Sequence, residues 1–292
     1  MLKKILFTFC LSFFVILKSY AQYSKQYVNT STVKHKGSTY KVIYMDRGLS
    51  GKKINAKYFA AKDLNGSSVP NRFYNWSKGK NIICVTSGTY MDNYDSKLAR
   101  PVGLTVDNGI VVNKGIADFD GLVIVYATGG VVATNLKDKN LTVQGGSISG
   151  IPLDIKGNAY HFNEFLKWCE ENGATVFQTH LLVYRNTLKI SSYNSSSKSQ
   201  ERRFLAVGND AEGNLVHCIV HSPEYTTLYE GSKRALNFLN EFKEMDVMWM
   251  INLDTGAQDV LSLYDSDGKI NPIIKGKITV SEAINLLVYY YQ

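Results

Sequence analysis

The sequence predicts an α+β fold, in which a mixed, largely antiparallel sheet packs with a few amphipathic helices in a single domain. Short runs of β-branched and aromatic residues outnumber helical segments, and most links between these runs have hairpin length. The composition, with 45% hydrophobic and 20% charged residues, is that of a globular protein and excludes collagen-like and mostly disordered classes. We find no internal repeat of fixed period.

The first half of the chain reads as strands joined by tight turns. VGLTV and IVVN flank Asp-Asn-Gly at residues 107–109, and such a sequence supplies the positive φ that a hairpin turn needs. GLVIVYA and GVVATNL form a second pair around residues 128–130. YKVIYM from residue 40 and NIICV from residue 81 are further β-rich runs.

The second half mixes helices and strands. Residues 161–173 place Phe162, Phe165, Leu166 and Cys169 at helical spacing, and Gly173 is suited to end that helix. An amphipathic helix is expected at residues 231–245 with Ser232 as its N-cap, and a short helix at 281–292. The expected strands are 175–184, 202–208, 214–221 and 247–254, and the Ser-rich stretch 191–200 is expected to be an exposed loop.

The N-terminal segment has the pattern of a secretory signal peptide. Two lysines precede an apolar run at residues 5–17, and Ser19 and Ala21 are small residues that suit a cleavage site. A membrane anchor is the alternative, but the run is shorter than the roughly 20 apolar residues of a spanning helix, and no later stretch is long enough. We therefore predict a signal peptide at 1–21, a lead-in at 22–39 and one domain at 40–292. The mature protein would then be periplasmic, at the cell surface or secreted, with no stable membrane span.

Charge and cysteine content give few indications of a partner. The formal net charge of +8 becomes +5 once the three lysines of the signal segment are removed. The remaining basic pairs are scattered, which argues against nucleic acid as a partner. Cys84, Cys169 and Cys218 lie in apolar surroundings without zinc-ligand spacing, and we expect buried free thiols. One disulfide with one free thiol is the alternative.

Familiar catalytic and cofactor motifs are missing from the sequence. GxGxxG after a strand, GxxxxGK[ST], GxSxG and HExxH do not occur, and the five histidines lack metal-ligand spacing. We therefore predict no cofactor and no metal. Asp92, Asp254 and Asp259 could supply hard oxygen ligands if a metal were used.

Polar residues at the ends of apolar strands are the candidate site. MWMINLD delivers Asp254 to the end of a strand just before Thr255 and Gly256, a common catalytic arrangement. Capping of a turn is the alternative role for this aspartate. After NIICV come Ser87, Gly88, Tyr90 and Asp92, although such residues also make ordinary turns.

Arg202 and Arg203 at the start of a strand form the third candidate segment. Arginine presents a fork of donors that suits phosphate. Two arginines at a strand edge can also simply face water.

Taken in order, these segments resemble the phosphodiester glycosidase family. SGTYMD at 87–92 resembles the family's NGGYFD or NAGMF motif, and RPVGLTVDNGIVVN at 100–113 resembles the Pro-x-Gly-Leu hairpin that follows it. FQTHLLVY at 177–184, RRFLAVG at 202–208 and INLDTG at 251–256 resemble the later TQSGP-like strand, R-T-A-V-G strand and LNLDGG motif. The likeness covers residues 40–268.

The chain departs from the family pattern at four places. Ser87 stands for the motif Asn, Thr89 for its second Gly, and Thr255 for the second Gly after Asp254. Arg203 lies five residues before Gly208, where the family arginine lies four before its Gly. These departures keep open a rival function, a catalytically degenerate, exported glycan-binding protein on the same scaffold.

The resemblance implies an exported hydrolase that cleaves a sugar, N-acetylglucosamine among the candidates, from a sugar-1-phosphodiester. Such a reaction passes through an oxocarbenium-like state, so Asp254 would stabilise positive charge or activate water. Arg203 or Arg202 would hold the charge of the departing phosphate. The expected substrate contacts are Ser87, Gly88, Tyr90, Asp92, Gln178, His180, Asn252, Thr255 and Gly256, with Tyr90 stacking on the sugar ring.

Overall fold

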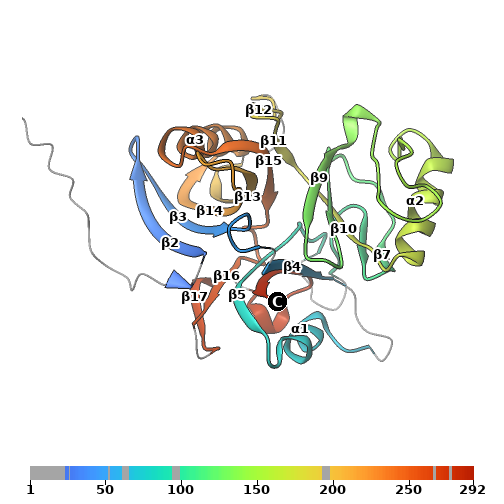
Figure 1. Ribbon diagram of the computed structural model, residues 1–292, viewed down its shortest axis with the longest axis horizontal. Coiled ribbons are helices and arrows are strands. Elements are labelled where there is room, and N and C mark those ends of the chain that lie inside the picture. The colour runs from blue at the N-terminus through green and yellow to red at the C-terminus, as the bar shows by residue number, and fades with distance from the viewer. Residues whose placement is uncertain are drawn as a thin grey trace, which may run out of the picture.

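Three antiparallel sheets meet around one apolar centre in the computed structural model of the protein (Figure 1). The structure describes residues 24–25, 27–51, 53–60, 66–93, 99–192, 198–265, 268–275 and 278–292. The predicted signal peptide and residues 193–197 of the Ser-rich stretch lie outside these ranges. All pairings between described strands are antiparallel, so the α+β class is confirmed, with three sheets where we expected one.

The first sheet has eight strands. Their spatial order is β1 (Ser24–Lys25), β2 (Val28–His35), β3 (Ser38–Asp46), β14 (Leu215–Thr226), β13 (Gln200–Asn209), β15 (Asp246–Leu253), β11 (Leu181–Tyr184) and β12 (Thr187–Leu188). Its outer face packs against α3 (Leu228–Phe242). Strands β13 and β15 lie at the middle of this sheet and carry the arginine pair and the strand that leads to Asp254.

The second and third sheets have five strands each. The second runs β7 (Ile110–Asn113), β6 (Thr105–Asp107), β10 (Thr175–Thr179), β8 (Gly121–Val125) and β9 (Val131–Asn135). The third runs β17 (Ile270–Lys275), β16 (Val260–Tyr264), β5 (Asn81–Thr86), β18 (Leu286–Tyr291) and β4 (Ile54–Phe59). α2 (Ala159–Glu171) covers the second sheet, and α1 (Val69–Ser77) with the 3₁₀ turn η2 (Val280–Glu282) covers the third.

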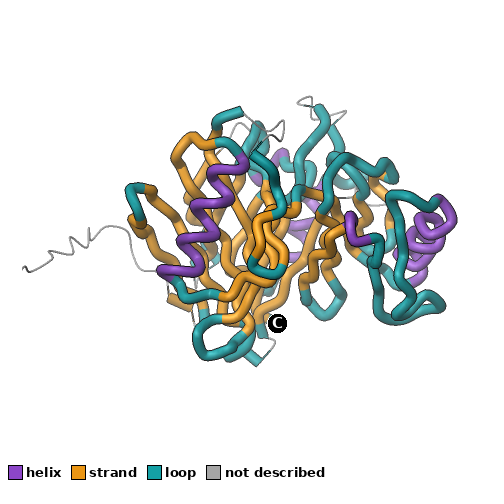
Figure 2. Tube along the Cα trace, turned by 90° about the horizontal axis from the view of Figure 1, so that it is seen from above, coloured by secondary structure: helices purple, strands orange, loops and turns teal. Residues whose placement is uncertain are grey.

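The central core joins the three sheets into a single domain. Leu205 of the first sheet, Phe177 of the second and Tyr58 of the third are fully buried in one cluster, and the rings of Tyr58 and Phe177 stack at 4.4 Å. The helices lie outside this core: Figure 2 shows α3 in front of the strands and α2 at the far end. A short 3₁₀ turn, η1 (Leu136–Asp138), follows β9.

Several sequence predictions of local structure are confirmed. The hairpin around residues 107–109 has Asn108 and Gly109 at positive φ, 51° and 79°. The helix predicted at 161–173 is α2, which begins after the N-cap Asn158 and ends before Gly173 at φ 55°. The three described cysteines are buried free thiols.

The helix predicted at 281–292 is wrong, whereas the helix predicted at 231–245 is present as α3 with a different N-cap. Residues 286–291 form strand β18, inserted between β5 and β4, because Leu287 and Tyr289 face the central core while Leu286 and Val288 face the α1 side. Both faces are therefore buried, which gives the continuous apolar run that we read as a helix.

Ser232 is not the N-cap of α3. Thr227 takes that position with extended φ and ψ, and its side chain accepts from the Glu230 N–H. Ser232 lies inside the helix, where its hydroxyl donates to the Leu228 carbonyl at 2.6 Å.

The strand predicted at 175–184 is divided between two sheets. Its first half, β10, belongs to the second sheet and its second half, β11, to the first, with His180 between them. This crossing brings His180 to the junction of two sheets, beside the end of β15, where the Asn252 N–H donates to the His180 carbonyl.

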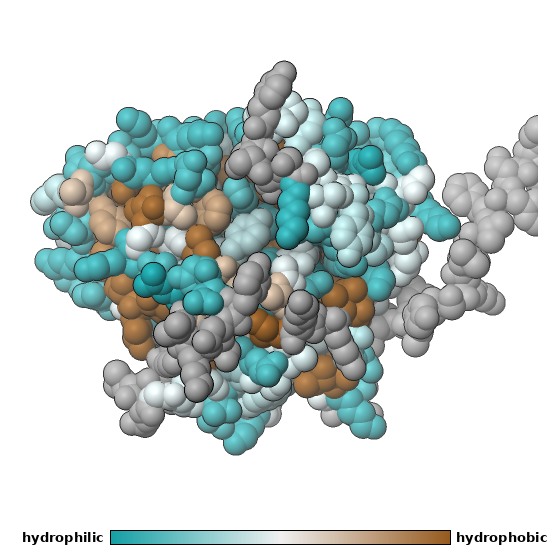
Figure 3. All heavy atoms as spheres, turned by 180° about the vertical axis from the view of Figure 1, so that it is seen from behind, coloured by the Kyte–Doolittle hydropathy of each residue, from teal (hydrophilic) through white to brown (hydrophobic). Residues whose placement is uncertain are grey.

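On the face shown in Figure 3, hydrophilic residues predominate and apolar residues reach the surface in separate places. Within the described ranges, no helix combines the length and apolar character that crossing a bilayer requires.

Candidate functional site

The three segments singled out in the sequence come together at one end of β15. The Asp254 N–H donates to the Gly88 carbonyl at 2.9 Å, which ties the end of β15 to the turn after β5. The Arg203 Nη1 group donates to the Val260 carbonyl at 2.8 Å and lies 3.4 Å from the Asp254 carbonyl. Residues far apart in the chain are thereby held in one place.

Asp254 is a buried carboxyl group, 3% exposed. Its Oδ1 accepts the Gly256 N–H at 2.8 Å. Burial raises the pKa of Asp254 to about 6, against the lowering effects of the Gly256 N–H and the Arg203 charge, while the neighbouring Asp259 adds to the rise. A carboxyl group with this pKa exchanges protons readily near neutral pH, which suits acid–base work.

Arg203 is a fully buried cation whose two terminal nitrogens, Nη1 and Nη2, both bond to protein groups. Its Nη2 pairs with the Asp259 carboxylate at 2.5 Å, and Nη1 reaches the Thr86 hydroxyl as well as the two carbonyls. Its Nε is buried without a hydrogen-bond partner in the described structure. Arg203 thus fixes the turn between Asp254 and Val260.

Arg202 points to the opposite face of β13 from Arg203, since neighbouring side chains of a strand alternate. Its Nε donates to the Thr226 carbonyl at 2.9 Å and its Nη2 to the Lys198 carbonyl. Its charge opposes the rise in the pKa of Tyr90 that burial and Asp254 produce. Arg202 is only 1% exposed, and no described residue accepts a hydrogen bond from its Nη1.

An aromatic cluster stands on the Arg202 side of the site. The rings of Tyr90, Phe119 and His180 lie within 4.5–5.8 Å of one another. The Asn252 Nδ2 donates to the Tyr90 hydroxyl at 2.6 Å, and this fixes the ring. Burial, first among several causes, lowers the pKa of His180, so the imidazole is neutral at neutral pH. Phe119 had no signal in the sequence, because a lone aromatic residue in a loop has no periodicity.

Two predicted substrate contacts are occupied within the protein. The Gln178 Oε1 accepts from Leu104 and Ala117, and its Nε2 donates to the Ala117 and Phe119 carbonyls. These four bonds use the whole amide. The side chain is fully buried, so it holds the loop that carries Phe119 instead of contacting a ligand directly.

The Ser87 hydroxyl is also committed to the fold. It donates to the Gln258 carbonyl at 2.5 Å and accepts the Val260 N–H at 2.8 Å. Ser87 is fully buried and joins the turn after β5 to the turn before β16. Its role in the site is again to position other groups.

Gly88 is packed too closely for any side chain. A Cβ there would lie 2.4 Å from Tyr58 and 2.7 Å from the Asn285 Oδ1. That same Oδ1 accepts the Gly88 N–H at 2.9 Å, and the Asn285 Nδ2 donates to the Thr89 carbonyl at 3.1 Å. Sequence reasoning missed Asn285, because it lies 197 residues away in a segment that we read as helix.

The remaining predicted residues divide between the site and the surface. The Thr255 hydroxyl donates to the Glu201 carbonyl at 2.7 Å, and Gly256 caps the Asp254 carboxylate through its N–H, so both shape the site. Asp92 instead forms an ion pair with Arg100 at 2.6 Å, and no described contact joins it to Asp254. Among the described residues, no three His, Cys, Asp or Glu side chains come together as a metal site.

Comparisons with known proteins support the fold alone. No protein-family model matches the chain, and no curated protein matches its sequence. The catalytic domain of zebrafish N-acetylglucosamine-1-phosphodiester alpha-N-acetylglucosaminidase, auto-inhibited by its pro-peptide, is similar in structure with a TM-score of 0.50 and 15% identity. The match covers 91% of this chain and 82% of that domain.

Two further structures are more distant. A hypothetical protein from Synechocystis has a TM-score of 0.46 at 10% identity, over 91% of this chain and 62% of that one. A protein from Burkholderia pseudomallei K96243, described by its name as exported, has a TM-score of 0.40 at 11% identity, over 91% and 74%.

Proposed function

We propose that the protein is an exported phosphodiester glycosidase-like hydrolase, which cleaves a sugar from a sugar-1-phosphodiester. The observation that carries the proposal is Asp254, a buried carboxyl group with a pKa raised to about 6, whose charge, like that of Arg202, acts on Tyr90 of the aromatic cluster. N-acetylglucosamine is the sugar that the resemblance in motif order favours. Export follows from the predicted signal peptide at residues 1–21.

Cleavage of the glycosidic bond requires a carboxylate near the anomeric carbon of the sugar. Bond cleavage builds positive charge on the sugar, and an ionised Asp254 stabilises that charge or takes a proton from the attacking water. A phosphodiester is already a good leaving group, so a strong general acid matters less than a cation near the departing oxygen atoms. Arg202 suits that role better than Arg203, since the Arg203 guanidinium is bound to Asp259.

The aromatic cluster supplies a surface for the sugar ring. Tyr90 and His180 present apolar ring faces together with polar atoms, as sugar rings require, and Phe119 packs against both. The bond from Asn252 fixes Tyr90 before a ligand arrives, which lowers the entropy lost on binding. The buried hydrogen bonds of Gln178, Ser87 and Asn285 hold the loops that carry this site in place.

A glycan-binding protein without activity is the second candidate. Ser87 stands where the resembled family has Asn, and its hydroxyl is committed to Gln258 and Val260, so it offers no bond to a substrate. The aromatic cluster would then hold a sugar without cleaving it.

Sugar release separates the two candidates. The purified mature protein is incubated with sugar-1-phosphodiesters, N-acetylglucosamine-1-phosphodiester included, and with methyl glycosides of the same sugars. We expect free sugar from a phosphodiester and much less from the methyl glycosides. The group that leaves a phosphodiester is a phosphate anion that Arg202 can hold, whereas a methyl glycoside has no such leaving group. Arg202→Gln should lower release from the phosphodiester. Glycan binding with no release from any substrate would contradict the hydrolase and favour the second candidate.

A further inference from the structure

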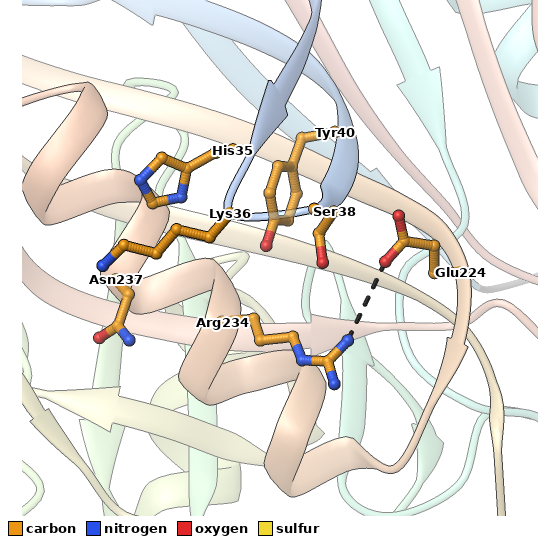
Figure 4. Close-up of a pocket in the computed structure, with 8 residues that line it drawn as sticks. His35, Lys36, Ser38, Tyr40, Glu224, Arg234 and Asn237 are labelled. Carbon is orange, nitrogen blue, oxygen red and sulfur yellow. Dashed lines mark ion pairs between the residues drawn. The ribbon is translucent and has the colours of Figure 1, made fainter.

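A polar cavity of about 330 Å³ lies apart from Asp254, between the β2–β3 hairpin, β14 and α3 (Figure 4). Ser38 and Tyr40 enter it from β3, Glu224 from β14, and Arg234 and Asn237 from α3. Its volume is at the low end of the range of about 300–1,000 Å³ that is typical of ligand sites. None of the residues that line it belongs to the site around Asp254.

Two buried hydroxyl groups line this cavity. Ser38 is 5% exposed and Tyr40 2%, and the Tyr40 ring is anchored by stacking on Phe238 at 4.4 Å. The two side chains interact with each other, and no hydrogen bond joins either hydroxyl to a third described residue. Burial raises the pKa of Tyr40, so its hydroxyl is neutral and both donates and accepts.

Charged and amide groups also line the cavity, together with His35, Gly37 and Lys36, whose ammonium pairs with Glu241. Arg234 and Glu224, whose side chains are 49% and 35% exposed, form an ion pair at 4.0 Å, which Figure 4 marks with a dashed line and which is too long for a hydrogen bond. Glu224 is fixed by the Thr39 N–H at 2.7 Å. The Asn237 side chain has no hydrogen-bond partner among the described residues, so its donor and its acceptor are both free.

The mixture of groups limits what the cavity can take. An inorganic anion would face the Glu224 carboxylate, and a simple cation would face Arg234. A molecule with several hydroxyl groups satisfies both, because each hydroxyl donates to one side and accepts from the other. Donors on one wall, the Glu224 acceptor held by Thr39 on another and rotatable hydroxyls between them match neighbouring hydroxyls on a ring.

We propose that this cavity is a second carbohydrate site, which binds one sugar unit between Tyr40, Arg234 and Glu224. The site stands whether or not Asp254 performs catalysis, since the two share no residue. The cavity would attach the protein to a glycan and would catalyse no reaction.

Titration of the mature protein with monosaccharides tests the proposal. N-acetylglucosamine, glucose and galactose are the probes, and calorimetry measures the dissociation constant. We compare the variants Arg234→Gln and Asn237→Leu with the control Lys233→Gln. Lys233 precedes Arg234 in α3, and its ammonium lies over the Tyr229 ring. Far-ultraviolet circular dichroism confirms that each variant is folded.

The expected result is sugar binding about tenfold weaker in Arg234→Gln and unchanged in Lys233→Gln, as the loss of a charged hydrogen bond predicts. Asn237→Leu should weaken binding in the same direction. Sugar binding that neither cavity variant alters would overturn the proposal and belong to the Asp254 site. Absence of sugar binding, or binding of inorganic phosphate that depends on Arg234, would also overturn it.

Discussion

Replacement of Asp254 by Asn should stabilise the folded protein at neutral pH. Asn has the shape of a protonated aspartate and keeps the oxygen that accepts the Gly256 N–H. The pKa of Asp254 rises from 3.8 to about 6 on folding, and this difference of about two pH units corresponds to roughly 3 kcal/mol of penalty for the buried charge. The Asp254→Asn variant avoids that penalty.

The sign of the pH dependence follows from the raised pKa. Well below pH 3.8 the carboxyl is protonated in the folded and the unfolded state, so it costs no stability there. Between about pH 4 and pH 6 the folded state holds the proton longer, and the free energy of unfolding of the wild type falls as pH rises. The advantage of Asp254→Asn should therefore be only about 0.5 kcal/mol at pH 4 and approach roughly 3 kcal/mol at pH 7.5.

Urea denaturation followed by tryptophan fluorescence measures this difference at both pH values. Asp92→Asn is the matched control, because Asp92 is part of a surface ion pair with Arg100, which contributes at most about 1 kcal/mol. The control should not be stabilised at pH 7.5. If Asp254→Asn were no more stable than the wild type at pH 7.5, the claim that the buried charge of Asp254 lowers the free energy of unfolding would be refuted.

Three further predictions concern the same site. In the wild type, kcat/KM for a phosphodiester should fall about tenfold per pH unit below about pH 6, because the reaction needs ionised Asp254; a flat profile down to pH 4.5 would contradict this role. Asp259→Asn should lower the free energy of unfolding by about 3–5 kcal/mol, since it leaves the Arg203 cation buried without its partner, and urea denaturation would show a smaller loss if the pair were solvated. Gly88→Ala should cost about 1–3 kcal/mol and lower kcat, because the added Cβ meets Tyr58 and displaces the carbonyl that holds Asp254; an unchanged midpoint and kcat would count against that packing.

Local sequence signals predicted the elements whose structure depends on local chemistry. The helix that ends at Gly173 and the turn at Asn108 and Gly109 need only their own caps and φ angles, and both are present. The C-terminal strand was misread because its apolar run fits a helix or a strand buried on both faces equally well. The division of residues 175–184 between two sheets depends on long-range pairing of β10 and β11, which a local pattern does not carry.

The candidate site was predictable only as far as local sequence signals reach. Asp254, Tyr90 and Arg202 follow or begin apolar strands, and the structure brings their segments to one place. Whether a polar side chain faces a ligand or the protein depends on tertiary partners. Ser87 and Gln178 have residue types that suit sugar hydroxyls, yet their bonds are made to distant backbone groups that no spacing in the sequence reveals.

The most direct test of the central claim is the release of free N-acetylglucosamine from its 1-phosphodiester by wild-type protein and by Asp254→Asn, side by side at pH 6.5. If Asp254 carries the reaction, the wild type releases the sugar and the variant does not, although the variant is folded and at least as stable. Equal release by both proteins would contradict the role of Asp254. No release by the wild type would contradict this sugar phosphodiester as its substrate.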